Sequence, residues 1–377
     1  MKKIILSLLL VFPLVACSSS GIAVNNLKAE TQGHFTEAQI KYLTNDDPSN
    51  TSPYNGNMSV SKPEPVTITW ESSRDDISYC VDFYQDCGEE GSLGYKIVSY
   101  LTDEASFDFY NPIFNQEYYV RVTGYKDGTS KKFEPSNVAS FKESPTVRGP
   151  RNLYVEGVEN FRDLGGWGYI KQGMIYRSGR FNEDKEETVK ASITDNGLYE
   201  IKNHLKIKTE IDLRRTSTNE VGGLTDKSVL GDNVNYYQLP MYYGGNNILT
   251  YQGTVSGDTM EYNNPEKIKE FFKILADENN YPIDFHCSIG KDRTGCLAYL
   301  VEGLLGFDKE IMYRDYMFTN FADAGMCKLT DITDRYGKTI DEYGSGNTLQ
   351  EKTYNYLNEV VGVSKEDLDS VIKILKL

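Results

Sequence analysis

Positive charge and histidine are both scarce in this sequence of 377 residues. It has 40 Lys and Arg against 55 Asp and Glu, a formal net charge of −15 at pH 7. So acidic a chain is repelled by a nucleic-acid backbone, which excludes nucleic-acid binding as its main function. The 3 histidines form no convincing metal cluster in the sequence. Any anionic ligand must therefore be attracted by a local group of positive charges.

Cysteine is also sparse, with 6 residues whose spacing matches neither a disulfide scaffold nor a zinc site. Setting Cys17 aside leaves an odd number. Cys80 and Cys87 are close enough in sequence to close a small oxidised loop, and the sequence leaves that pairing open.

The first twenty residues, MKKIILSLLLVFPLVACSSS, are typical of a secretory signal. A positively charged start precedes an apolar run at 4–12 that is too short to span a bilayer. The residues LVA before Cys17 resemble the lipobox of bacterial lipoproteins, which implies removal of residues 1–16 and lipidation of Cys17. We therefore expect a protein tethered by lipid to a bacterial membrane, outside the cytoplasm. The alternative is an ordinary signal peptide with a chance cysteine.

Two folded regions are expected after a polar segment. Residues 17–62 are rich in Ser, Asn, Thr and Asp, which predicts a flexible tether with room for a short helix at FTEAQIKYL. From Val66 onwards apolar residues alternate with polar ones, as in VTITW (66–70), YKIVSYL (95–101) and EYYVRVTGY (117–125). This spacing predicts a small all-β sandwich over 63–146. Trp70 and Tyr118-x-Val120-x-Val122 resemble core positions of fibronectin type III domains.

After the proline-containing boundary at 143–152, the hydrophobic periodicity changes from that of strands alone to alternating strands and helices. Strands are expected at GMIYRS (173–178), KTEIDLR (208–214), VNYYQLP (234–240) and PIDFHC (282–287). Helices are expected to start after the cap Asn264, at Thr294 and at Ser364. Because strands and helices alternate, residues 150–377 are predicted to form an α/β domain with a central, mainly parallel sheet flanked by helices.

The stretch IDFHCSIGKDRTG (283–295) combines a strand, a short loop and a helix start. Backbone N–H groups of such a loop can converge on an anion, and the helix N-terminus adds positive potential. The same donors favour a thiolate, which makes Cys287 a candidate nucleophile. Arg293 has the planar fork that grips two phosphate oxygens, and Lys291 supplies local positive charge.

Other loop residues are expected to assist. His286 is expected to orient the loop, and the Thr294 hydroxyl to hydrogen-bond the sulfur. The expected phosphate-binding residues are Ser288, Ile289, Gly290, Lys291, Asp292 and Arg293. The alternative interpretation is that Cys287 is a buried structural cysteine and that its neighbours resemble catalytic residues by chance.

The segment HCSIGKDRTG resembles the signature H-C-x-x-G-x-x-R-[ST]-G of cysteine-dependent phosphatases. ENFRDLGG (159–166), IYRSGR (175–180) and IDLRRTSTNE (211–220) are similar to segments of atypical bacterial tyrosine phosphatases that also accept phosphoinositides. The resemblance implies a phosphocysteine intermediate, a phosphorylated protein or lipid substrate and no cofactor. A catalytically silent phosphate-recognition or adhesion lipoprotein is the alternative.

Better-known tyrosine phosphatases use the aspartate of a WPD loop as the proton donor, and this sequence has no WPD triplet. Two other aspartates are therefore candidates for the proton donor. Asp292 is the donor that the GKDRTG form implies. Asp212 is the second, with the competing interpretation that it pairs with Arg214 or Arg177 to fix the pocket wall.

Overall fold

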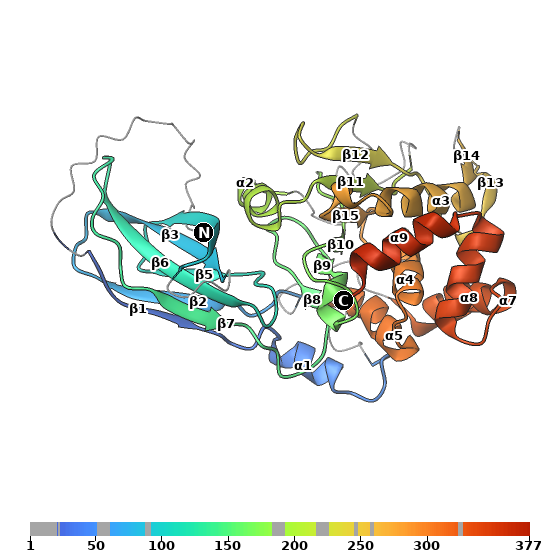
Figure 1. Cartoon of the computed structure of the whole chain (residues 1–377), viewed down its shortest axis with the longest axis horizontal. Helices are drawn as coiled ribbons and strands as arrows, with labels where there is room; N and C mark the ends of the chain where they lie inside the picture. The colour runs from blue at the N-terminus through green and yellow to red at the C-terminus, as the bar shows by residue number, and fades with distance from the viewer. Residues whose placement is uncertain are drawn as a thin grey trace. The chain divides into compact units, whose positions relative to one another are not determined.

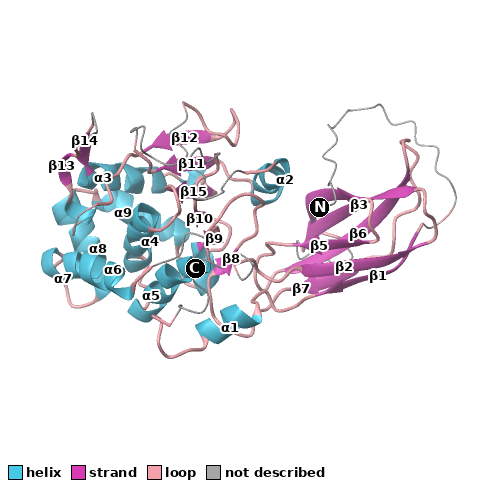
Figure 2. Ribbon diagram, turned by 180° about the vertical axis from the view of Figure 1, so that it is seen from behind, coloured by secondary structure: helices cyan, strands magenta, loops and turns pink. Residues whose placement is uncertain are grey.

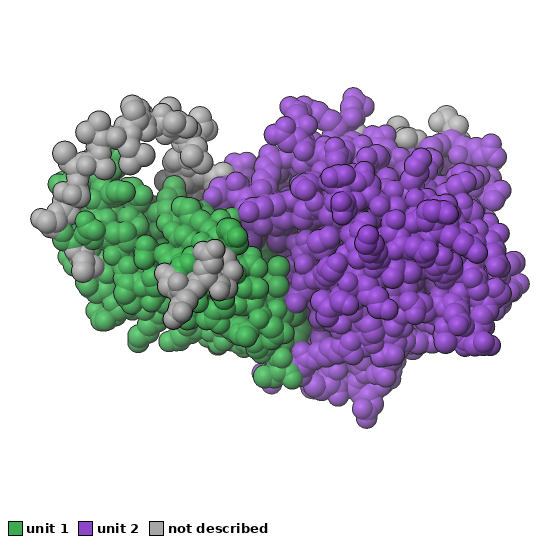
Figure 3. Space-filling view, in the orientation of Figure 1, with its two compact units in different colours: residues 1–35, 63–146 green, residues 36–62, 147–377 purple. Residues whose placement is uncertain are grey.

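The structure is a computed structural model, and it describes residues 21, 23–50, 61–86, 92–182, 193–215, 226–244, 248–256, 260–322 and 327–377. The expected signal peptide, Cys17 and Cys87 lie outside the described residues. Among the helices of the described residues, none is long and apolar enough to cross a membrane. The chain divides into two compact units, coloured separately in Figure 3. Unit 1 comprises 1–35 and 63–146, and unit 2 comprises 36–62 and 147–377.

Unit 1 is all-β and consists of two antiparallel sheets (Figures 1 and 2). One sheet has the order β1 (Val24–Glu30), β2 (Val66–Ser72), β5 (Ser106–Phe109). The other has the order β4 (Tyr95–Thr102), β3 (Ile77–Gln85), β6 (Glu117–Lys126), β7 (Ala139–Lys142).

Aromatic side chains from both sheets fill the space between them. Phe83 of β3 stacks on Phe109 of β5 with ring centroids 3.9 Å apart, and Trp70 of β2 meets Tyr79 of β3 at 5.1 Å. These rings are buried because alternate residues of each strand point to the same face. The expected all-β region is confirmed, whereas its likeness to fibronectin type III domains stays a prediction.

The predicted tether is wrong over part of its length. β1 pairs with β2, and α1 (Glu37–Leu43) is an ordered helix capped by Thr36. The tether was predicted from the average composition of this segment, which is polar. Its few apolar residues nevertheless have the spacings that a strand and a helix require. Leu27 and Tyr42 are accordingly buried. The short helix considered for FTEAQIKYL is confirmed.

Unit 2 is built on a six-stranded mixed sheet of order β12-β11-β15-β10-β9-β8. β10, β11, β12 and β15 run parallel, and β8 and β9 extend the β10 edge antiparallel. All four expected strands of this domain are present. The strand bounds are β8 (Arg151–Asn152), β9 (Arg162–Asp163), β10 (Ile175–Ser178), β11 (Thr209–Asp212), β12 (Asn235–Gln238) and β15 (Ile283–His286).

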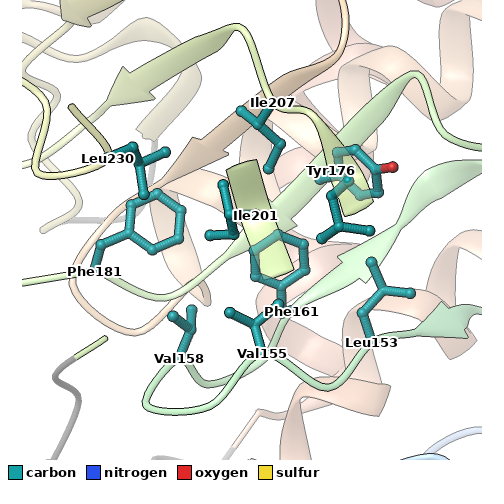
Figure 4. Packing of buried hydrophobic residues seen from close by; sticks show 10 residues of the cluster. Leu153, Val155, Val158, Phe161, Tyr176, Phe181, Ile201, Ile207 and Leu230 are labelled. Carbon is teal, nitrogen blue, oxygen red and sulfur yellow. The ribbon is translucent and has the colours of Figure 1, made fainter. Parts of the chain in front are cut away.

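Helices cover both faces of this sheet. On one face lie α2 (Asp195–Tyr199) and the π-helical turn η4 (Glu200–Leu205), and Figure 4 shows Ile201 of η4 among the buried residues of that layer. The larger helical layer, in orange to red in Figure 1, includes α4 and α9. Besides α1 and α2, the α-helices of the described residues are α3 (Asn264–Leu275), α4 (Asp292–Leu304), α5 (Lys309–Phe318), α6 (Leu329–Asp331), α7 (Lys338–Tyr343), α8 (Leu349–Asn355) and α9 (Lys365–Leu375). A small hairpin consists of β13 (Gln252–Thr254) and β14 (Glu261–Asn263).

Two expected helix starts move slightly. The cap of α3 is Asn263, whose side chain accepts from the Glu266 N–H. Asn264 is instead buried, and its amide donates to the Tyr242 and Ile248 carbonyls at 2.8 and 2.6 Å. α4 begins at Asp292, before the expected Thr294. The cap at Ser364 is confirmed.

Candidate active site

The parallel strands of unit 2 end at one edge of the sheet. Ser178 of β10 and Asp212 of β11 both lie in register with His286 of β15, and Gln238 of β12 lies in register with Asp212. Loops that follow these residues therefore start side by side, which is where α/β sheets bind their ligands.

The loop from Cys287 to Lys291 connects β15 directly to α4. Its Gly290 has φ +71°, a left-handed conformation that favours glycine. A Cβ at this position would lie 2.5 Å from the Ser178 carbonyl oxygen. The glycine therefore permits both the turn and the close approach of β10.

Cys287 lies at the start of this loop and is buried. Burial alone would raise the pKa of its thiol, but the Arg293 guanidinium and the Thr294 hydroxyl and backbone N–H outweigh it, so the pKa is lowered. The thiolate is the nucleophilic form of cysteine. The site thus favours the reactive form at the residue that the sequence proposed.

Arg293 lies in the first turn of α4, with its guanidinium facing the loop. Its Nη1 donates to the Leu213 carbonyl at 3.3 Å and its Nη2 to Ser288 Oγ at 3.5 Å. The ring of Tyr243 is 4.9 Å from the guanidinium and remains partly exposed. The sequence left open whether the tyrosine-rich stretch at 237–247 lines the pocket, and this contact places Tyr243 at the site.

His286 is buried between the loop and a neighbouring strand. Its Nδ1 is 3.2 Å from the Cys287 carbonyl and its Nε2 is 3.0 Å from Glu210 Oε1. Burial opposes the charged ring, but Asp212 and Glu210 raise the pKa of His286 to about 9. Both ring nitrogens of the imidazolium can then donate, which agrees with the expected orienting role.

Glu210 was missed by the sequence analysis. Glu210 and Asp212 are two residues apart on β11, which puts them on one face, but only the pairing of β11 with β15 brings that face to His286. One atom each of Glu210, Asp212 and His286 lie within 4.8 Å of one another, a spacing that could hold a metal ion. These atoms already have protein partners, since Glu210 bonds His286 and Ser228 and Asp212 bonds Arg214. The cluster therefore fits a hydrogen-bonded support for the loop.

The contacts of Asp212 fit the interpretation that it pairs with Arg214 to fix the pocket wall, rather than a role as proton donor. Asp212 is buried, and it accepts hydrogen bonds from Arg214 Nη2 at 2.6 Å and from the Tyr236 hydroxyl at 3.0 Å. Burial would raise the pKa of Asp212, but His286 and Arg214 hold it below its ordinary value. A carboxylate stabilised in this way is a poor proton donor.

Asp292 is the first residue of α4, and its side chain is partly exposed. Burial raises the pKa of this carboxyl against the opposing effect of Lys291 and Arg293. Its Oδ1 is 3.9 Å from Arg335 Nη1. A raised pKa favours the protonated form that a general acid needs, and the catalytic role of Asp292 stays a prediction.

The loop that carries Cys287 and Arg293 and the sheet edge from which it starts both lie in unit 2. Sequence comparison identifies the family of this part of the chain. The model of the tyrosine phosphatase family matches residues 153–376, more than half of the chain. The chain belongs to this family.

Individual relatives match over shorter stretches or at low identity. An inositol diphosphatase, DSP2 of Arabidopsis thaliana, is 56% identical over 33 residues, which are 9% of this chain and 13% of that protein. The core catalytic domain of the PP-IP phosphatase SIW14 from S. cerevisiae has 17% identity over 44% of this chain and 84% of its own, with a TM-score of 0.28. TpbA of P. aeruginosa has 18% identity over 44% of this chain and 76% of its own, with a TM-score of 0.27.

Proposed function

We propose that the protein hydrolyses phosphate monoesters through a phosphocysteine intermediate on Cys287. The observation that carries the proposal is the buried Cys287 thiol, whose pKa is lowered by Arg293 and Thr294. A nucleophilic thiolate next to a guanidinium is the pair that attack on a phosphoryl group needs.

In the first step, the Cys287 thiolate attacks phosphorus while the loop N–H groups and Arg293 hold the non-bridging oxygens. An S–P bond forms and the P–O bond to the leaving group breaks. Protonated Asp292 gives its proton to the leaving oxygen, which departs as an alcohol or phenol. The raised pKa of Asp292 supports this assignment.

In the second step, water attacks the phosphocysteine. The Asp292 carboxylate takes a proton from that water, an O–P bond forms, and the S–P bond breaks. The Thr294 hydroxyl stabilises the thiolate that leaves, and inorganic phosphate is released. In this proposal Cys287, Arg293, Asp292 and Thr294 carry out both steps without a metal or a cofactor.

Two substrate classes are proposed, phosphotyrosine and inositol phosphates or phosphoinositides. Tyr243, in contact with Arg293, favours an aromatic leaving group. Lys291 and the similarity of a short segment to DSP2, an inositol diphosphatase, favour a polyanionic inositol ring. Comparing kcat/KM on phosphotyrosine peptides with kcat/KM on soluble inositol phosphates tests which class is preferred.

We also propose that the enzyme acts outside the cytoplasm, anchored to a bacterial membrane through lipid on Cys17. The lipobox-like sequence supports this proposal. Replacing Cys17→Ala should move the protein from the membrane fraction to the soluble extracytoplasmic fraction. Unchanged membrane association of the variant would refute the lipid anchor.

The central test is turnover of an aryl phosphate in the presence of EDTA. Wild type should be active, and Cys287→Ser should reduce kcat by about 10⁴-fold or more because the nucleophile is lost. Cys80→Ser, a half-buried cysteine of unit 1, is the matched control and should keep wild-type rates. Equal, near-zero rates in folded wild type and Cys287→Ser, with phosphate still bound, would instead support the silent recognition protein.

A further inference from the structure

Three successive carbonyl groups of the loop are held from outside by polar groups of unit 2. The Ser288 carbonyl accepts from Arg180, from its N–H at 3.2 Å and its Nη1 at 3.0 Å. The Ile289 carbonyl accepts from Asn160 Nδ2 at 3.1 Å. The Gly290 carbonyl accepts from Asn160 Nδ2 at 3.1 Å and from Arg177 Nη2 at 2.9 Å.

These contacts fix the direction of the loop's N–H groups. In a planar trans peptide, the carbonyl of one residue and the N–H of the next point in opposite directions. Holding the carbonyls of 288, 289 and 290 outward therefore turns the N–H groups of Ile289, Gly290 and Lys291 to the opposite side. That side is the one where an anion bound by the loop would lie.

Asn160 has a special place among the donors because one side chain holds two carbonyls. Each of its two amide hydrogens has one loop oxygen to meet. Its Oδ1 accepts from Arg162 Nη1, so the amide is oriented with its NH2 group toward the loop. Arg162 is itself fixed by Asp315 of α5, with Nε 3.1 Å from Oδ1.

The backbone at both ends of this contact is suited to it. Asn160 has φ +55°, a left-handed conformation that asparagine tolerates better than most residues. On the loop side, a Cβ at Gly290 would lie 2.8 Å from Asn160 Nδ2. The glycine of the signature loop therefore leaves the room that the Asn160 amide occupies.

We propose that Asn160 is a positioning residue, which turns the Gly290 and Lys291 N–H groups toward the phosphoryl group without touching the substrate. This inference rests on the proposed function for its catalytic consequence. Its structural part, the orientation of an anion-binding loop, is measurable without turnover.

The test is the isosteric substitution Asn160→Asp. Aspartate keeps the acceptor for Arg162 and tolerates positive φ, but it faces two carbonyl oxygens without a hydrogen to donate. The matched control is Asn115→Asp in unit 1, another asparagine with positive φ (63°), whose Oδ1 also accepts a hydrogen bond, from Ser144. Asn160→Ala is the second variant, and it enlarges an existing cavity of about 200 Å³ that Asn160 and Arg162 line.

We expect Asn160→Asp to reduce kcat/KM for an aryl phosphate by roughly 10²-fold, the scale of losing one oxyanion donor. Inorganic phosphate, measured by calorimetry on Cys287→Ser with and without Asn160→Asp, should bind about tenfold more weakly in the double variant. The Cys287 thiol of Asn160→Asp should also titrate at higher pH than in wild type, because misdirected N–H groups no longer favour the thiolate. Asn160→Ala should shift all three in the same direction, and Asn115→Asp should shift none.

The outcomes separate this inference from the proposed function. Wild-type phosphate affinity and thiol titration in folded Asn160→Asp and Asn160→Ala would overturn the positioning role, even if turnover depends on Cys287. If wild type shows no turnover but Asn160→Asp weakens phosphate binding, the positioning role stands and the proposed hydrolysis fails. If folded Cys287→Ser binds no phosphate and wild type shows no turnover, both are overturned.

Discussion

The two units bury charge in opposite ways. In the described part of unit 1, Glu143 is the one buried Asp, Glu, Lys or Arg, and the core is dominated by aromatic and branched side chains. Unit 2 buries a set of charged residues from its sheet and from α5, including Arg162, Arg177, Arg180 and Asp315.

This contrast separates residues that stabilise from residues that serve chemistry. A buried ion pair costs desolvation that its attraction barely offsets, so it is a poor way to stabilise a fold. Apolar rings of similar size would stabilise unit 2 at least as well. Arg177 and Arg180 instead donate to carbonyls of the Cys287 loop, and Asp315 pairs with Arg177, so these buried charges position the loop. The comparison predicts that substitutions in unit 1 change stability and that substitutions at the sheet edge of unit 2 change activity.

The largest effect should come from Arg293→Lys. Lysine keeps the charge but loses the fork that holds two phosphate oxygens, so kcat/KM should fall by about 10³–10⁴-fold, or about 4–5 kcal/mol in the barrier. Steady-state kinetics on an aryl phosphate measure this loss. Denaturant unfolding of the same variant should change by less than about 1 kcal/mol. If Arg293→Lys keeps a tenth of wild-type kcat/KM, the proposed division between stabilising residues in unit 1 and activity-determining residues in unit 2 is contradicted.

Phe83→Ala should show the reverse pattern. Removing this buried ring, which stacks on Phe109, should cost about 3–5 kcal/mol in the unfolding free energy of unit 1. The kcat/KM of the folded protein should stay at the wild-type value, measured well below the unfolding midpoint. Phe271→Ala is the matched variant in unit 2 and should cost a similar unfolding free energy there. Equal losses of activity in the two variants at full folding would contradict the separation.

Asp292→Asn should have an intermediate effect that depends on the leaving group. With an alkyl phosphate, whose leaving oxygen needs a proton, kcat/KM should fall by about 10²-fold, or about 2.7 kcal/mol. With an activated aryl phosphate the loss in kcat/KM, which reports the first step and not hydrolysis of the phosphocysteine, should be small because that oxygen leaves unprotonated. A uniform loss on both substrates would remove Asp292 from the role of general acid.

The smallest effect is a difference in pH dependence between the units. His286, with its pKa raised to about 9, stabilises unit 2 fully below its unfolded pKa near 6.5, and this contribution is lost as pH rises through 9. Burial raises the pKa of Asp284 to about 8, so its ionisation destabilises the fold in the same direction. The loss of the His286 contribution alone should destabilise unit 2 by about 2 kcal/mol between pH 7 and 9. In unit 1, the pKa of Glu143 is about 7, so its effect is largely complete by pH 7.

Fluorescence can follow each unit separately, because the 2 tryptophans fall one in each. Denaturant unfolding of Trp70→Phe reports unit 2 through Trp167, and Trp167→Phe reports unit 1 through Trp70. The pH slope should appear in the first variant and be reduced by adding Asp284→Asn. An equal slope in both units would contradict the assignment to the buried cluster.

The part of the site that the sequence predicts is the part that is local in the chain. Cys287, Gly290 and Arg293 lie within seven consecutive residues, so the geometry of one strand, loop and helix start relates them. All four parallel strands were predictable because each combines β-branched or aromatic residues with flanking turn residues.

What escaped prediction depends on partners far along the chain. Asn160 reaches the loop across about 130 residues, and Glu210 reaches His286 across 76. β8 and β9 have two residues each, too short for any periodicity. β1 and α1 were missed or left uncertain because a few apolar residues are diluted by polar neighbours. Such elements exist through tertiary contacts, which no local pattern records.

The path of the chain between the units has a consequence for any attempt to separate them. Residues 24–30 belong to a sheet of unit 1, residues 36–62 belong to unit 2, and the chain then returns to unit 1 before completing unit 2. A protease that cuts once, near residue 146, would release a C-terminal fragment without α1, whose Tyr42 carbonyl accepts from Arg314 at 3.3 Å. Neither unit can be excised whole by a single cut, so the smallest intact catalytic fragment needs two pieces of chain.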